Sequence, residues 1–456
     1  MKSYVPFALL ALVGIGEMAF AAETRPTIRF YRQDEDWRAL CAHPELRTTF
    51  YDGLKCLTLA DELTLSMGGE LRERVESSVH PAFGLKGEGD SYVLQRYLLH
   101  SDLRYGDHLR VFAQLGYYDE SGRKTGPLST DVNHGDWQQA FIDVAGDWSG
   151  AHYQLREGRQ ELAFGSSRLV SVRESPNGRR SFHATRLDGR WTEARVTAFY
   201  ARPVLIKPGS FDDDTAAGER LWGVYGTRAS KASLKADIYY FDFAKEEVRY
   251  AAGSGAEHRR TVGLRLFGQR APWDWDVELA YQGGDFDHGD IAAWTVASNV
   301  GFRWDGGYAP RLGVKLDIAS GDRDAADRRL ETFNAMYPKL PYFSEANLVA
   351  PANVIDLHPS VSFVPVSNWT LGVSLDALWR QTTADAVYAT PMAPYAGTAG
   401  RPGRYTGSQA ILDLLWQPND NLEVSSQWVH FSPGSMLREV GGRSGNFAML
   451  SLAVKF

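Results

Sequence analysis

The sequence contains few cysteines and no long apolar run. Its 456 residues include two cysteines, which excludes a disulfide-dense secreted scaffold. No stretch approaches the roughly 18 uninterrupted apolar residues of a membrane-spanning helix, and the apolar run 5–15 is too short to cross a bilayer. The net charge of −7 excludes a general nucleic-acid binder. These absences exclude a helical membrane protein without yet naming an alternative.

Motifs of enzyme chemistry are missing as well. The sequence has no G-x-S-x-G, H-E-x-x-H or Walker pattern. Its histidines are scattered singly, and His100, His183 and His358 lie on expected strands rather than beside a nucleophile. We therefore expect no enzymatic activity, no cofactor and no metal site.

The N-terminus has the pattern of a secretory signal peptide. Lys2 gives a small positive region, residues 5–15 are apolar, and Ala19-Phe20-Ala21 fits the small-x-small rule for cleavage before Ala22. The alternative, an amphipathic N-terminal helix of a soluble protein, does not account for that cleavage site. We assign residues 1–21 to a signal peptide and expect the chain to be exported.

The composition is aromatic yet polar. Aromatic residues make up 12%, the chain has 44 glycines, and the mean hydropathy is −0.32. Transmembrane barrels combine these properties, because each of their strands has one apolar and one polar face. Period-two alternation follows from Leu63 onward: Leu312, Val314 and Leu316 share one parity, and Arg311 and Lys315 share the other.

Alternation alone does not separate a soluble sandwich, with its apolar face inside, from an outer-membrane barrel, whose apolar face meets lipid. Three features favour the barrel. The segments run about ten to sixteen residues, against a mode of five or six in soluble sheets. Tryptophans such as Trp304 and Trp369 fall near segment ends, as in an interfacial girdle. The last segment places Leu450, Leu452, Val454 and Phe456 on one face, and its terminal aromatic resembles the sorting signal of outer-membrane proteins.

Counting the segments predicts an all-β fold: a transmembrane antiparallel β-barrel of about 18 strands over residues 63–456. The expected strands are 63–78, 91–106, 108–121, 135–147, 151–163, 180–192, 193–203, 219–230, 231–243, 258–270, 273–287, 290–306, 308–321, 352–366, 367–382, 402–418, 419–432 and 445–456. Short periplasmic turns alternate with longer outer connections, among them 164–179, 244–257 and 322–351. The tight connection 284–289 is the exception on the outer side.

Residues 22–62 lack sustained alternation. We interpret them as a periplasmic N-terminal extension with a helical turn around 34–40, or as a plug that fills part of the lumen. Cys41 and Cys56 lie in this segment. In an oxidising periplasm they form either a disulfide or two separate buried thiols, and their spacing does not decide between the two.

Arginines on lumen parity are the candidate solute path, because guanidinium groups bind carboxylates and phosphates with paired hydrogen bonds. The basic residues concentrate in one run, 156–190. The expected path residues are Arg72, Arg74, Arg96, Arg104, Arg156, Arg159, Arg180, Arg186, Asp188, Arg190, Arg195, Arg265 and Arg380. The alternative is that lumen arginines pair with lumen carboxylates and only stiffen the wall. Arg159 has lipid parity unless a bulge forms at Gly158 or the residue lies beyond the apolar band.

The connection 322–351 is too long for a plain loop, and loops of that length are usually functional or disordered. Its aromatic residues indicate order. We expect either a constriction that folds inward and presents Arg323, Arg328 and Arg329, or an outer cap.

Three segments resemble the alginate export family of outer-membrane channels: LREGRQEL at 155–162 with the SSRLVSVRESPNGRRSFHATRLDG that follows, SGDRDAADRRLETFNAMYPKLPYF from 320, and YRQDEDW at 31–37. The resemblance implies a monomeric 18-stranded barrel that secretes alginate through an arginine-lined constriction, with Arg96 as one of its arginines. The chain departs from the pattern at Gln138 or Gln139, where the exporter is basic, and at acidic Glu161. The solute is then alginate, another acidic saccharide or a small organic anion.

Three functions follow from this sequence. The first is export of an anionic polysaccharide such as alginate, received from a periplasmic scaffold. The second is uptake of small organic anions or acidic sugars, which uses the same physics in the opposite direction. The third is a structural or adhesive barrel with a plugged lumen. In each case we expect a monomer in the bacterial outer membrane, inserted by the barrel assembly machinery and in contact with lipid and lipopolysaccharide but not with nucleic acid.

Overall fold

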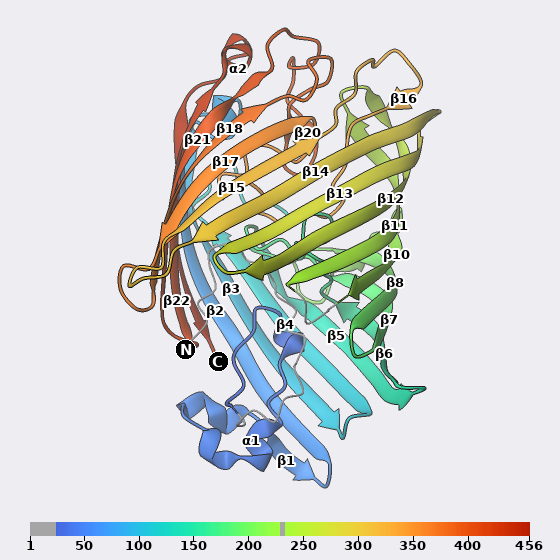
Figure 1. The fold of residues 1–456 in the computed structure, drawn as a ribbon, viewed down its shortest axis with the longest axis vertical. Helices are drawn as coiled ribbons and strands as arrows, with labels where there is room; N and C mark the ends of the chain where they lie inside the picture. The colour runs from blue at the N-terminus through green and yellow to red at the C-terminus, as the bar shows by residue number, and fades with distance from the viewer. Residues whose placement is uncertain (1–23, 229–232) are drawn as a thin grey trace.

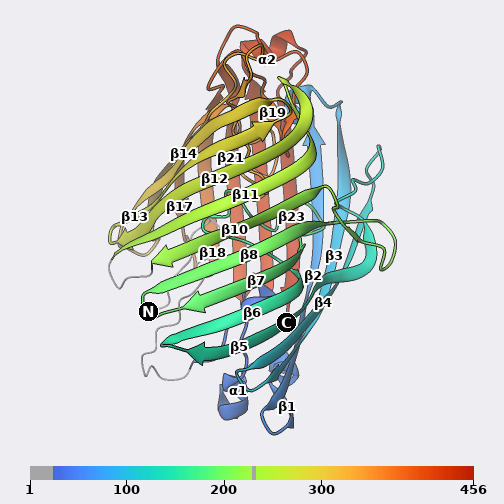
Figure 2. The same ribbon diagram turned by 90° about the vertical axis from the view of Figure 1, so that its right-hand side faces the viewer.

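The computed structural model describes residues 24–228 and 233–456, so the expected signal peptide lies outside the described residues. In the described part of the chain, eighteen long strands form one closed antiparallel β-barrel (Figures 1 and 2). No helix in these two ranges is long and apolar enough to cross a membrane. The predicted fold class is confirmed, including the number of strands.

The wall strands follow one another around the barrel in chain order. They are β2 (Leu63–Val79), β3 (Gly89–Tyr105), β4 (Leu109–Ser121), β5 (Asn133–Trp148), β6 (Ala151–Gln160), β7 (Phe182–Arg190), β8 (Ala194–Leu205), β10 (Glu219–Arg228), β11 (Leu234–Tyr250), β12 (Gly253–Arg270), β13 (Trp273–Phe286), β14 (Gly289–Arg303), β15 (Arg311–Ala319), β17 (Val354–Phe363), β18 (Trp369–Trp379), β21 (Tyr405–Asn419), β22 (Leu422–Pro433) and β23 (Gly445–Lys455). The loops add β9 (Asp214–Thr215), β16 (Arg329–Leu330), β19 (Tyr388–Ala389), β20 (Ala393–Pro394), η4 (Ala82–Gly84) and α2 (Ser435–Glu439).

The last strand closes the barrel against the first. Leu71 on β2 pairs with Val454 on β23 at one edge and with Tyr97 on β3 at the other. Closure leaves the barrel without an edge strand, which is the condition for strands to cross a lipid bilayer. The two faces differ as the alternation predicts: on β18 the side chain of Leu375 is 59% exposed, while its neighbour Asp376 is 1% exposed.

Short and long connections lie at opposite ends of the barrel. At the short-turn end the connections include 149–150, 271–272 and 420–421, and at the long-loop end they include 161–181, 320–353 and 380–404. One expected long loop is wrong: β11 and β12 continue past the predicted ends, so 244–257 is a strand pair joined by the two-residue turn 251–252. The tight connection on the long-loop side is confirmed at 287–288.

The lumen is largely filled by loops from the long-loop end. Phe164 of loop 161–181 stacks on Phe199 of the wall, with ring centroids 4.8 Å apart. Tyr337 of loop 320–353 packs edge-on against Phe182 and Phe243. These loops and the inner wall form one apolar core. The loops bury apolar side chains of the inner wall that would otherwise meet water in the lumen. They also narrow the channel that a barrel of this size would leave open.

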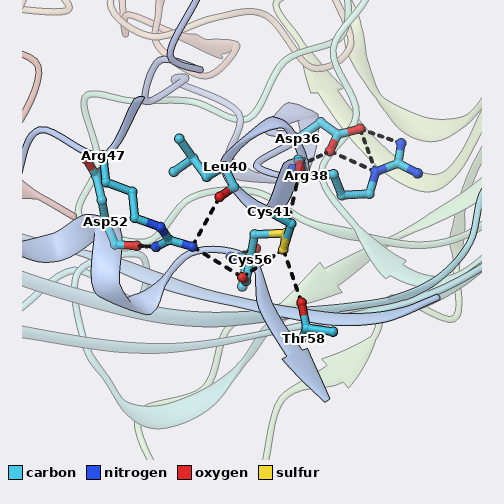
Figure 3. Close-up of a disulfide and its surroundings, with 9 residues drawn as sticks. Asp36, Arg38, Leu40, Cys41, Arg47, Asp52, Cys56 and Thr58 are labelled. Carbon is cyan, nitrogen blue, oxygen red and sulfur yellow. Dashed lines mark hydrogen bonds and ion pairs between the residues drawn. A yellow bond between two sulfur atoms is a disulfide. The ribbon is translucent and has the colours of Figure 1, made fainter. Parts of the chain in front are cut away.

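The N-terminal extension lies at the short-turn end, where Figure 1 shows α1 and β1 in blue below the barrel. It consists of η1 (Arg32–Asp34), α1 (Ala39–Ala42), η2 (Pro44–Leu46), η3 (Phe50–Leu54) and β1 (Leu57–Ala60), which extends the sheet beside β2. Cys41 and Cys56 are bonded, with Cα atoms 5.6 Å apart (Figure 3). Trp37, Leu40 and Cys56 form a small separate core around that bond.

Candidate functional site

Two arginines of the lumen wall lie directly opposite each other. Arg72 on β2 is the cross-strand partner of Arg96 on β3, and both side chains are buried. Alternation places both on the inner face, and the register brings two positive charges to the same height. Adjacent like charges in a buried site are unfavourable unless an anion lies between them.

Glu174 of the inward loop 161–181 supplies that anion. Its Oε1 lies 3.2 Å from Nη1 of Arg72 and forms a short ion pair with Nη1 of Arg96. Its Oε2 lies 3.5 Å from Nε of Arg179 on the same loop. Burial raises the pKa of the Glu174 carboxyl, but the positive charges of Arg96, Arg179 and Arg72 outweigh burial and hold that pKa at about 2. We call these four residues the constriction.

Asn177 fastens the loop that carries Glu174. Its side-chain amide donates to the main-chain oxygens of Gln95, Asp119 and Asp131 at 2.9–3.0 Å, and its main-chain N–H donates to the Asp131 carboxylate at 3.0 Å. Nε of Arg96 donates to the Asn177 carbonyl at 2.8 Å. The constriction therefore depends on hydrogen bonds from one loop to strands β3 and β4 and to the connection 122–132, which a displaced loop would lose together.

The N-terminal extension reaches the constriction from the opposite side. The guanidinium of Arg179 lies 4.4 Å from the ring of Phe30, and Arg179 also pairs with Glu161 at 3.1 Å. Gln139 on β5 donates a hydrogen bond of 2.9 Å to the side chain of Gln33. Part of the extension thus lies inside the lumen, while the remainder stays at the short-turn end.

Five other arginines form a second inner group on β3–β8, closer to the short-turn end. Each has a carboxylate partner: Arg104 and Arg110 pair with Asp102, Arg156 with Asp143, and Arg186 and Arg195 with Asp188. The side chains of Arg186 and Arg195 remain 15% and 23% exposed, against 0% for Arg96. Within this group Arg186 and Arg195 are therefore the arginines most accessible to water, and Asp188 bridges them as an anion.

The other expected path residues are placed as follows. Arg74 pairs with Glu76 and with Glu345 of loop 320–353, at 2.7 and 2.8 Å. Arg265 pairs with Asp237 and Asp276 inside the wall. Arg180 lies on the inward loop, 4.8 Å from the Tyr337 ring. Arg190 is exposed at the short-turn end, where it bonds Gln154. Of these four arginines, Arg74 and Arg180 therefore contact the inward loops, Arg265 pairs within the wall, and Arg190 lies at the short-turn end.

Two expectations about the path are wrong. Arg159 shares the outward parity of exposed Leu155 and pairs with Asp136 and Asp213, so it lies outside the lumen under loop 206–218. The register break lies on β5 at Gln138–Gln139, not at Gly158.

Arg380 is fully buried and donates to main-chain oxygens of its own loop, including those of Thr398 and Arg401 at 2.6 Å. It organises loop 380–404 and offers a solute no surface.

The loop 320–353 does fold inward, but not with the expected residues. Arg323, Arg328 and Arg329 are exposed, and Nε of Arg328 bonds the His288 carbonyl at the rim of the barrel. The inward part of the loop begins near Phe333, because its apolar side chains follow that residue and its three exposed arginines precede it.

Sequence reasoning missed Glu174 and Asn177. Their only signal in the sequence was an acid and an amide among the arginines of 173–180.

A model of the family described as "Alginate export" matches residues 63–451, which covers most of the chain and all but the end of the barrel. The chain belongs to the alginate export family. Its fold and family indicate a bacterial outer-membrane channel. No curated protein matches the chain.

Solved porins share the fold of this alginate export family member. The structure of Pseudomonas aeruginosa OccK2 (OpdF) in complex with glucuronate is 11% identical, with a TM-score of 0.55 over 86% of this chain and 98% of that one. Pseudomonas aeruginosa OccK8 (OprE) and Acinetobacter baumannii OccAB4 are 11% and 10% identical, each with a TM-score of 0.56 over the same shares of the two chains. At these identities the likeness concerns the fold alone.

Proposed function

We propose that this protein passes anionic saccharides across the outer membrane, and that uronate carboxylates bind transiently to Arg72, Arg96 and Arg179. The observation that supports this most directly is Glu174, a carboxylate of the protein itself held by those three guanidinium groups. A site that holds one carboxylate at this spacing suits another carboxylate of similar size, because the charge and the hydrogen-bond donors are the same.

In this proposal Glu174 is a tethered competitor. The inward loop closes the path when no solute is present, and a uronate that reaches the constriction exchanges with Glu174. Successive uronates of a polymer would exchange in turn, which allows passage without a deep binding minimum. The more exposed Arg186 and Arg195 give an anion its first contacts at the short-turn end.

Export of an acidic polysaccharide is our first choice of direction, because the matching family is described by export. Uptake of a small acidic sugar is the second, favoured by the glucuronate bound to OccK2. A passive pore has no built-in direction, so the structure does not separate export from uptake. The neighbouring genes distinguish the two: a polysaccharide polymerase gene favours export, and genes for catabolic enzymes favour uptake.

Planar-bilayer recording of the refolded barrel tests the proposal. We expect anion preference in a salt gradient and block by oligouronates added to one side. Glu174→Gln removes the competing charge and should raise the open probability and strengthen oligouronate block several-fold. The matched control Glu88→Gln changes an exposed carboxylate that pairs with Arg443 outside the path, and should behave as wild type.

Three results would contradict the proposal. Cation preference without oligouronate block would exclude an anion path. A lack of conductance in both wild type and Glu174→Gln would favour the plugged structural barrel. Arg96→Gln should weaken anion preference, and an unchanged reversal potential would place the constriction elsewhere.

A further inference from the structure

The lumen face of β15, β17 and β18 carries a cluster of opposite charge to the constriction. Asp317 on β15 is the cross-strand partner of Asp356 on β17, and Lys315 is the partner of His358. Asp376 on β18 lies beside His358, because the adjacent pair in the register is Leu357 with Ala377. Three carboxylates and one imidazole therefore meet on one inner surface.

This cluster is deeply buried and short of positive charge. Asp356 and Asp376 are 0% and 1% exposed. The nearest cation is Lys315, whose Nζ lies 3.8 Å from Asp356 and 3.6 Å from Asp317. Asp317 also interacts with Arg168 and Lys339, so the carboxylates short of positive charge are Asp356 and Asp376. One ammonium group at this distance does not compensate both, and an isolated buried carboxylate costs several kcal/mol.

The hydrogen bonding of the cluster is incomplete as well. Among the described residues, no N–H or hydroxyl donor reaches either carboxylate oxygen of Asp356, Oδ1 of Asp376 or Nδ1 of His358. The Asp356 and Asp376 carboxyl groups face each other closely enough to share a proton when no cation lies between them. Oδ2 of Asp376 does accept a bond of 2.7 Å from Gln409. Buried polar atoms are nearly always paired, so several unpaired ligand atoms on three neighbouring side chains point to a missing partner that accepts electron pairs.

We propose that Asp356, His358 and Asp376 bind one divalent transition-metal ion of the zinc class on the lumen wall. One ligand atom from each residue lies within 4.8 Å of the others, a spacing that a single ion can bridge with small side-chain movements. Imidazole with two carboxylates suits Zn²⁺ or Mn²⁺, whereas Ca²⁺ and Mg²⁺ prefer oxygen ligands alone. Three protein ligands leave one coordination position of a tetrahedral ion free.

The ion would remove the excess negative charge from this part of the wall. Two positive charges offset Asp356 and Asp376, and Lys315 is then left to pair with Asp317. The open position accepts water or the carboxylate of a passing solute. That last role rests on the proposed function, whereas the metal site itself does not.

A second acidic group, Asp136 with Asp212 and Asp213, also has ligand spacing. We do not place a metal there, because Arg159 already pairs with Asp136 and Asp213 and the side chain of Asp212 is exposed. The Asp136, Asp212 and Asp213 group therefore serves as a negative control in the metal-binding test.

The test is calorimetric titration of Zn²⁺ into the refolded, EDTA-treated barrel, with bound metal measured after dialysis. We expect about one equivalent, and at least tenfold weaker binding in Asp356→Asn, His358→Gln and Asp376→Asn. Asp413→Asn is the matched control, because Asp413 is another lumen carboxylate of the wall, bonded to Gln427. Asp413→Asn and Asp212→Asn should bind as wild type.

Co²⁺ substitution in the wild-type barrel keeps the test independent of variant folding. We expect visible absorption bands of bound Co²⁺ that Zn²⁺ displaces. No saturable binding, or binding unchanged in all three ligand variants, would overturn the site. A barrel that binds the metal but shows no anion selectivity would contradict the proposed function and leave the metal site standing.

Discussion

Arg32 donates a hydrogen bond of 2.6 Å from Nη2 to the main-chain oxygen of Phe456. Its Nη1 donates to the Gly69 carbonyl at 2.9 Å, and Gly69 and Phe456 themselves exchange main-chain hydrogen bonds. One side chain of the N-terminal extension thus joins both sides of the seam that closes the barrel. Nε of Arg32 also pairs with buried Glu35 at 2.7 Å.

Arg32→Ala should release the start of the extension from the seam. The change removes two charge-assisted bonds and leaves Glu35 buried without its cation, a loss of roughly 3 kcal/mol in docking free energy. Limited proteolysis of the refolded protein should cut near residue 30 at least tenfold faster. Arg29→Ala is the control, because Arg29 is exposed in the same segment. Equal cleavage rates for the two variants would show that Arg32 does not hold the extension.

Replacing Cys41 and Cys56 by serine should loosen the extension without opening the barrel. The bond closes a loop with a sequence separation of 15, and loops of that size are stabilised by about 3 kcal/mol. We expect faster hydrogen exchange in residues 37–58 and unchanged exchange in the wall strands. Altered electrophoretic mobility of the folded barrel would contradict this, because it would make the extension part of the barrel's own stability.

The buried Asp322 should make the outer loops sensitive to pH. Burial raises the pKa of its carboxyl to about 6, with a further contribution from the Asp385 carboxylate. The folded loop therefore binds a proton more tightly than the unfolded loop. Its stability should be greatest below about pH 4 and should fall as the pH rises through 6.

Asp322→Asn removes this dependence and should stabilise loop 320–353 at pH 7.5 by about 1–3 kcal/mol. Hydrogen exchange of that loop between pH 4 and 7.5 measures the effect, after correction for the intrinsic exchange rate. Asp324→Asn changes an exposed carboxylate two residues away and should leave the slope in place. A wild-type loop whose stability rises with pH would reverse the sign and refute the prediction.

The barrel could be predicted from the sequence because its signal is local. Alternation of Leu375 with Asp376, repeated along each strand, assigns one side chain to lipid and the next to the lumen. The same parity placed Arg72, Arg96 and Arg186 on the inner face. Parity also gave Arg159 an outward side chain; the error was to expect a bulge at Gly158 that would turn it into the lumen. The predicted β11 and β12 were too short because the ends of these strands are polar.

The amino-acid sequence by itself determined a closed barrel of eighteen strands and the inner face of wall arginines such as Arg72, Arg96 and Arg186, since strand periodicity needs no distant contact. Only the tertiary structure decided that Glu174 neutralises Arg72 and Arg96, that Cys41 bonds Cys56, and that Asp356 and His358 meet Asp376 with too little positive charge. These contacts join loops or separate strands whose sequences have no shared period. The chain could bring them together only by closing the barrel and folding its loops inward.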